Sequence, residues 1–180
     1  MTNTTREGQE QLAAWLNRLI EILRLQGGET WLALVQIASG KTAAIALDGI
    51  ALEVTAVGGD ALQLLFNYAL SPNSINFRSD ADTLRDIVAG RLTLDAALAN
   101  GKIYARNHLD ELLSMYKLVM RILADSATNP QLQELWMEFD SSRSASATRR
   151  LPSLLEGQKP SYGYFIKSVP EDVLAIEVEP

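Results

Sequence analysis

Cysteine is absent from this 180-residue sequence, and histidine occurs once, as His108. Without cysteine the chain has no disulfides, thiolate nucleophiles, iron–sulfur clusters or cysteine-based zinc sites. A single histidine also excludes any site built from several imidazoles. We therefore predict no metal site and no cofactor.

Positive charge and aromatic residues are also scarce. Sixteen Lys and Arg face 22 Asp and Glu, for a formal net charge of -6, and aromatics make up 7% of the chain. Proteins that bind nucleic acid through phosphates need a surplus of cations, so we expect no nucleic-acid partner. The hydrophobic fraction of 47% is ordinary for a globular domain and predicts an aliphatic core.

Long hydrophobic runs and targeting signals are missing as well. The most apolar stretch, Trp31–Ala38, is interrupted by Gln36 and is far shorter than the roughly 20 residues that span a bilayer. The first eleven residues are polar and include Arg6 and Glu7, unlike a secretory signal peptide. We predict a cytoplasmic protein without an integral membrane segment.

The hydrophobic periodicity predicts an α+β fold. Three- and four-residue spacing predicts helices over Glu10–Arg24, Asp60–Leu70, Leu84–Val88, Leu94–Leu98, Leu109–Leu123 and Pro130–Phe139. Short apolar or alternating runs predict strands over Trp31–Ala38, Lys41–Leu47, Ile50–Val57, Ile75–Arg78 and Lys102–Arg106. Asp48-Gly49 between two of these strands is a strong hairpin signal.

The chain divides into three parts by composition. Residues 1–140 form the predicted domain, and residues 141–150, rich in Ser and Arg, form a predicted linker. Residues 151–180 form a predicted C-terminal extension that packs on the domain, with a hairpin of strands 162–167 and 173–178. The spacing of Ser79 and Asp82 predicts a capping box, and Thr93 predicts a second helix cap.

Candidate catalytic motifs are weak. Gly40-Lys41-Thr42 ends like a phosphate-binding loop, but Val35 occupies the position of that loop's first glycine, which favours a plain turn. His108 precedes a helix and has no Gly-x-Ser-x-Gly elbow to serve, so we favour a structural cap over a catalytic base. Carboxylates at a helix start are stabilised by the macrodipole alone, which accounts for Asp80, Asp82 and Asp86. We predict no enzymatic activity.

One helix has a composition that could serve binding. The segment 109–123 carries Met115, Tyr116 and Met120 among leucines. Methionine fills irregular apolar space, so this helix could line a cavity for an apolar ligand. The pattern by itself favours ordinary core packing over a cavity.

A longer run of motifs resembles the sterol carrier protein 2 family. The run starts with Ile75-Asn-Phe-Arg-Ser-Asp80 and an apolar helix, continues with Gly90-Arg91-Leu92, and ends with an alanine-rich helix before Gly101-Lys102-Ile103. The resemblance extends over Gly8–Phe139. The chain departs from the family's glycines with Ser79 before Asp80 and with Asn107 after the last strand.

The resemblance implies a mostly antiparallel five-stranded sheet covered by helices, with a hydrophobic tunnel. That tunnel implies a non-catalytic carrier of a fatty acyl chain, sterol or isoprenoid-like ligand. The residues that we expect to line it are Leu65, Phe66, Phe77, Ile87, Leu112, Met115, Tyr116, Val119 and Met120. The alternative is an accessory or dimerisation module that presents a hydrophobic substrate to a partner enzyme, in which the C-terminal hairpin offers an edge to a second copy.

Overall fold

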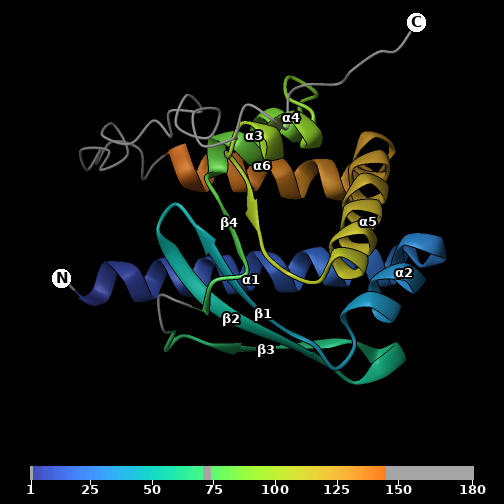
Figure 1. Cartoon of the computed structure of the whole chain (residues 1–180), viewed down its shortest axis with the longest axis horizontal. Coiled ribbons are helices and arrows are strands. Elements are labelled where there is room, and N and C mark those ends of the chain that lie inside the picture. The colour runs from blue at the N-terminus through green and yellow to red at the C-terminus, as the bar shows by residue number, and fades with distance from the viewer. Residues whose placement is uncertain (1, 71–73, 145–180) are drawn as a thin grey trace, which may run out of the picture. The chain divides into compact units, whose positions relative to one another are not determined.

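The computed structural model describes residues 2–70 and 74–144. Within them a five-stranded sheet has the order β3-β2-β1-β4-β5 (Figure 1). The strands are β1 (Thr42–Leu47), β2 (Ile50–Val57), β3 (Gln63–Asn67), β4 (Phe77–Ser79) and β5 (Tyr104–Ala105). The predicted α+β class and the number of strands are therefore confirmed.

Six α-helices and one 3-10 turn accompany the sheet within the described residues. They are α1 (Thr2–Gln26), α2 (Gly28–Ala38), the 3-10 turn η1 (Gly59–Ala61), α3 (Ala81–Val88), α4 (Leu94–Ala99), α5 (Leu109–Thr128) and α6 (Pro130–Ser144). Figure 1 shows α1 and α6 running side by side, with α5 crossing near one end of the pair, and these helices also pack on one another. Helix α1 contacts β2 and β3 and so covers part of the sheet.

The prediction of a strand over Trp31–Ala38 is wrong, because this segment is helix α2. Trp31 and Leu34 are buried one helical turn apart, whereas Leu32 is largely exposed. That spacing of three residues suits a helix packed on one face. A short apolar run does not by itself distinguish a buried helix from a buried strand.

The predicted helix over Asp60–Leu70 is also wrong. A 3-10 turn over residues 59–61 leads into strand β3. Burial alternates along β3, with Leu64 and Phe66 half-buried and Leu65 exposed. Leu65 and Phe66 therefore point to opposite faces of the sheet.

The sheet is mixed, with three antiparallel strand pairs and one parallel pair. Strand β1 pairs antiparallel with β2 but parallel with β4, with Ile45 opposite Phe77.

The turn between β1 and β2 follows the prediction, because Asp48 and Gly49 both have positive φ, at 51° and 78°. Two-residue hairpin turns of type I′ require that conformation at both positions.

The two faces of the sheet differ in chemistry. On the face away from α1, polar partners meet across the strands: the hydroxyls of Thr42 and Thr55 lie 2.8 Å apart, and Asn67 donates to Glu53 at 3.2 Å. Leu52 and Val54 on the other face are buried. The antiparallel strands β1, β2 and β3 therefore have one face covered by the core and one face open to solvent.

Three groups of buried apolar residues make up the core. The first lies among α1, α2, α5 and α6 and includes Leu23, Leu132 and Leu135. The second joins the sheet to α1 and α6 and includes Leu12, Leu52 and Phe139. The third, which we call the α3–α5 cluster, has Ile87, Leu94, Ala97 and Ile103 buried and Phe77, Leu92, Tyr116, Val119 and Leu123 half-buried around them.

Helix α3 is capped by Asp80 and not by the predicted Ser79–Asp82 box. The Asp80 carboxylate accepts hydrogen bonds from the Thr83 amide at 2.6 Å and from the Thr83 hydroxyl at 2.9 Å. Ser79 ends β4, and its hydroxyl donates to the carbonyl of Lys102 at 3.3 Å. The cap of α4 by Thr93 follows the prediction, since its hydroxyl accepts from the Ala96 amide at 3.2 Å.

Removing the α3 cap should have a measurable cost. We expect Asp80→Ala to lower the free energy of unfolding by about 1 kcal/mol, because it leaves the Thr83 amide without its acceptor. Urea denaturation followed by circular dichroism measures this. Asp82→Ala, in the same turn but in an exposed pair with Arg85, is the control and should change stability by less than about 0.5 kcal/mol. Equal losses from the two variants would contradict the cap.

Helix α6 continues to Ser144, four residues into the stretch 141–150 that composition assigned to a linker. The rest of that linker and the predicted extension over 151–180, with its two strands, lie outside the described residues.

Candidate functional site

The structure brings four of the predicted ligand-binding residues together. Phe77 from β4, Ile87 from α3, and Tyr116 and Val119 from α5 all belong to the α3–α5 cluster. The chain distance between β4 and α5 is long, so this proximity comes from the fold. The cluster is therefore the strongest candidate for an apolar binding surface.

The other predicted residues lie elsewhere. Phe66 on β3 packs against the second core group, and Leu65 is 57% exposed on the opposite face of the sheet. On α5, Leu112 is half-buried, while Met115 and Met120 are 38% and 44% exposed. Since Leu65 and Phe66 face opposite ways, a single cavity cannot take both side chains.

Helix caps and glycines position the α3–α5 cluster. Asp80 and Thr93 start the two short helices. Gly90 and Gly101, both with φ near 70°, follow their ends and turn the chain back. These turns place Ile87, Leu94 and Ala97 as a buried apolar floor. Helix α5 then supplies half-buried side chains at three- and four-residue spacing: Tyr116, Val119 and Leu123.

A polar contact lies beside the apolar side chains of this cluster. The Tyr116 hydroxyl donates to Oδ2 of Asp95 at 3.1 Å, which ties α5 to the first turn of α4. The hydrogen bond to Asp95 raises the pKa of Tyr116 above its ordinary value, with desolvation and the carboxylate's charge acting in the same direction. Tyr116 thus packs its ring in the cluster while its hydroxyl is held by a carboxylate.

Sequence reasoning missed Asp95. Its position, two residues after the Thr93 cap, is typical of an acidic residue in a first helical turn and carries no sign of a ligand role. Its partner lies 21 residues away, so no local spacing relates the two. Only the tertiary arrangement identifies the pair.

Helix α5 also presents a row of exposed apolar side chains beyond the cluster. Leu109 is 71% exposed, Leu113 is 51% exposed, and Met120 continues the row toward the helix end. The spacing of four and seven residues puts them on one helical stripe. Exposed large aliphatics that share one stripe are more informative than single ones, because they form a contact surface.

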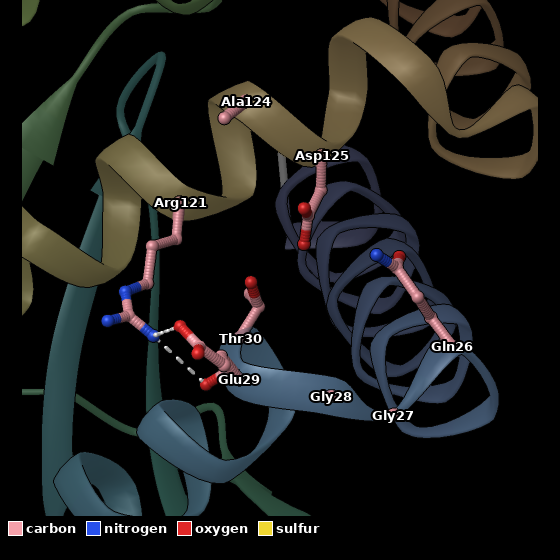
Figure 2. Close-up of a pocket in the computed structure, with 8 residues that line it drawn as sticks. All are labelled: Gln26, Gly27, Gly28, Glu29, Thr30, Arg121, Ala124 and Asp125. Atoms are coloured by element: carbon pink, nitrogen blue, oxygen red, sulfur yellow. Dashed lines mark hydrogen bonds and ion pairs between the residues drawn. The ribbon is translucent and has the colours of Figure 1, made fainter.

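A pocket of about 340 Å³ lies at a different place, between the α1–α2 turn and α5 (Figure 2). Arg121 pairs with Glu29 at 3.2 Å across it, and Figure 2 shows the Asp125 carboxylate pointing into the space between the helices. Its lining is Gln26, Gly27, Gly28, Glu29, Thr30, Arg121, Ala124 and Asp125. None of the predicted apolar residues lines this pocket, and its charged lining does not suit a hydrocarbon chain.

The described residues hold no cluster of metal ligands and no membrane-spanning helix. Within residues 2–70 and 74–144, no three His, Asp or Glu side chains are grouped so that they could hold a metal ion. His108 occupies the N-cap position of α5, but its side chain makes no capping hydrogen bond. No helix in the described part of the chain is long and apolar enough to span a membrane.

Comparison with known proteins finds no match among family models, curated proteins or solved structures. The similarity to the sterol carrier protein 2 family therefore stays a prediction from the sequence motifs.

Proposed function

We propose that this protein is a non-catalytic binding protein for a lipid or other hydrophobic ligand, which it holds at the α3–α5 cluster. The observation that carries the proposal is the half-buried state of large apolar side chains over a buried apolar floor. Phe77, Leu92, Tyr116, Val119 and Leu123 pack against the core yet keep part of their surface in contact with solvent. A hydrophobic ligand that covers these side chains removes their remaining apolar surface from water, which favours binding.

The hydrophobic effect is sufficient for this function. Burying about ten methylenes at about 0.8 kcal/mol each contributes roughly 8 kcal/mol before ordering costs. Micromolar binding then requires no dedicated catalytic group. The protein's part is to present an apolar surface with a defined shape.

The arrangement of α5 favours this surface. Its backbone makes its main close approaches to α2 and α6, which hold it in place. Toward the α3–α5 cluster it reaches mainly through side chains such as Tyr116 and Val119. Side chains change rotamer more readily than packed backbones separate, so a ligand can be admitted between α5 and α4 without unfolding the helix.

Replacing Val119 with tryptophan tests the proposal. We expect Val119→Trp to weaken binding of the neutral fluorescent probe Nile red by about tenfold or more, because the indole takes space that the ligand would fill. Fluorescence titration of the full chain measures this. Val57→Trp, at a half-buried valine on the polar face of the sheet, is the matched control and should bind the probe like the parent protein.

Stability decides between a binding surface and ordinary core. The thermal midpoints of both tryptophan variants are measured alongside the titrations, and Val119→Ser provides a second variant that adds no bulk. Unchanged probe binding in Val119→Trp would contradict the proposal. Loss of binding only in proportion to a loss of folded protein would identify Val119 as plain core.

The exposed α5 row supports a second candidate, an interaction or dimerisation module. Leu109 and Leu113 are more than half exposed and share a stripe. Native mass spectrometry separates the two candidates in one measurement. A monomer that carries a discrete, organically extractable mass favours the binding protein, whereas a ligand-free dimer favours the module.

A further inference from the structure

The Tyr116–Asp95 contact bears on the chemistry of the ligand's polar end. Tyr116 belongs to the α3–α5 cluster through its ring, and its hydroxyl meets the Asp95 carboxylate 3.1 Å away. Asp95 itself is exposed, so this contact marks a place where the apolar cluster meets water. A ligand with one polar end would put that end at such a place.

Asp95 presents a negative charge there. None of the ion pairs among the described residues includes Asp95. Arg91, the basic residue shortly before α4, is engaged by Asp86 at 2.8 Å. The tyrosine hydroxyl donates to Oδ2, which leaves Oδ1 of the same carboxylate as an acceptor. The local chemistry therefore accepts hydrogen bonds and repels anions.

We propose that the ligand ends in a neutral group that donates a hydrogen bond, such as the hydroxyl of a long-chain alcohol, and not in a carboxylate. The alcohol donates to Asp95 while its chain covers the apolar side chains around Tyr116. A fatty acid would bring a second negative charge close to Asp95, and like charges brought together at a binding surface oppose association. This inference rests on the proposed function and specifies the substrate class of the same site.

The test compares ligands of equal chain length on the full-length protein. Decanol, decanoate and methyl decanoate compete with Nile red at pH 8, where the acid is ionised. We expect decanol to bind about tenfold more tightly than decanoate, with the ester between them because it accepts but does not donate. Raising the salt concentration should reduce the disadvantage of decanoate, since an exposed charge is screened.

Asp95→Asn should narrow the preference for alcohol over acid to about threefold or less, because the amide keeps the size of the side chain and removes the charge. Asp60→Asn is the control: it removes one exposed charge from the 3-10 turn between β2 and β3 and should leave the preference for alcohol over acid unchanged.

Tyr116→Phe keeps the aromatic ring and leaves the Asp95 carboxylate in place, so this variant should still bind decanoate more weakly than decanol. In Asp95→Asn the pKa of Tyr116 should fall toward its ordinary value, which an ultraviolet titration detects, and an unchanged circular dichroism spectrum shows that the variant is folded.

The outcomes separate this inference from the proposed function. If Nile red and all three ligands fail to bind, both are wrong. If decanoate competes as well as decanol with the parent protein, or if Asp95→Asn leaves a tenfold preference intact, the site binds hydrophobic molecules and only the inference about the head group is wrong.

Discussion

Replacing Leu52 with alanine is expected to lower the free energy of unfolding by about 3–5 kcal/mol. Leu52 lies in the middle of β2, has no solvent-exposed surface and packs in the core group that joins the sheet to α1 and α6. Truncation removes buried methyl groups and leaves a cavity, and β-sheet backbone on one side limits how far the surroundings can relax. Guanidinium denaturation monitored by tryptophan fluorescence gives the value.

Leu65→Ala is the matched control for that experiment. It makes the same substitution on the neighbouring strand β3, but Leu65 lies on the opposite face of the sheet and is 57% exposed. We expect a change of no more than about 0.5 kcal/mol. Similar losses from the two leucines would contradict the assignment of one covered and one open face, and with it the strand conformation of residues 63–67.

Replacing Trp136 with alanine is the second change with a large expected effect, a loss of about 3 kcal/mol. Trp136 on α6 packs against Trp15 of α1 with ring centroids 5.1 Å apart and the rings tilted, and Phe139 completes the aromatic group. Its indole N–H donates to the hydroxyl of buried Ser126 on α5 at 3.0 Å. One side chain thus links three helices, so its removal opens space at the point where they meet.

Trp136→Phe separates packing from hydrogen bonding. Phenylalanine keeps an aromatic ring against Trp15 but has no donor for Ser126, and we expect a loss of about 1 kcal/mol. Thermal and urea denaturation of both variants measure the difference. A loss as large in Trp136→Phe as in Trp136→Ala would mean that the hydrogen bond outweighs the aromatic contacts, contrary to the expectation.

Local sequence signals predicted the parts of the fold that local physics controls. The Asp48-Gly49 turn, the Thr93 cap and the helix after His108 all depend on a few adjacent residues. Residues 31–38 and 60–70 were assigned to the wrong class because their apolar residues fit both periodicities. In the second case Leu62, Leu65 and Phe66 have helical spacing, but Leu64 and Phe66 are the pair that packs inward.

The parallel pairing of β1 with β4 had no local signal. It depends on the path that the chain takes between β1 and β4. Side-chain alternation in Ile75–Arg78 indicates a strand but does not indicate its direction relative to β1. The same limit applies to the candidate site. Phe77, Ile87, Tyr116 and Val119 were predicted to line one tunnel from three different elements, and the fold places them in one cluster. Asp95 was not predicted, because its role comes from a partner on another helix.

The position of β1 in the sheet has a consequence for synthesis of the chain. Strand β1 has β2 on one side, available at once through the hairpin, but its other neighbour, β4, begins only at Phe77. Until β4 has left the ribosome, one edge of β1 therefore has no partner strand. Unpaired edges of nascent sheets are where chains associate wrongly. Strand β1 is rich in alanine, with Ala43, Ala44 and Ala46, and alanine has a low strand propensity. Other chains should therefore pair less readily with the open edge of β1 before β4 covers it.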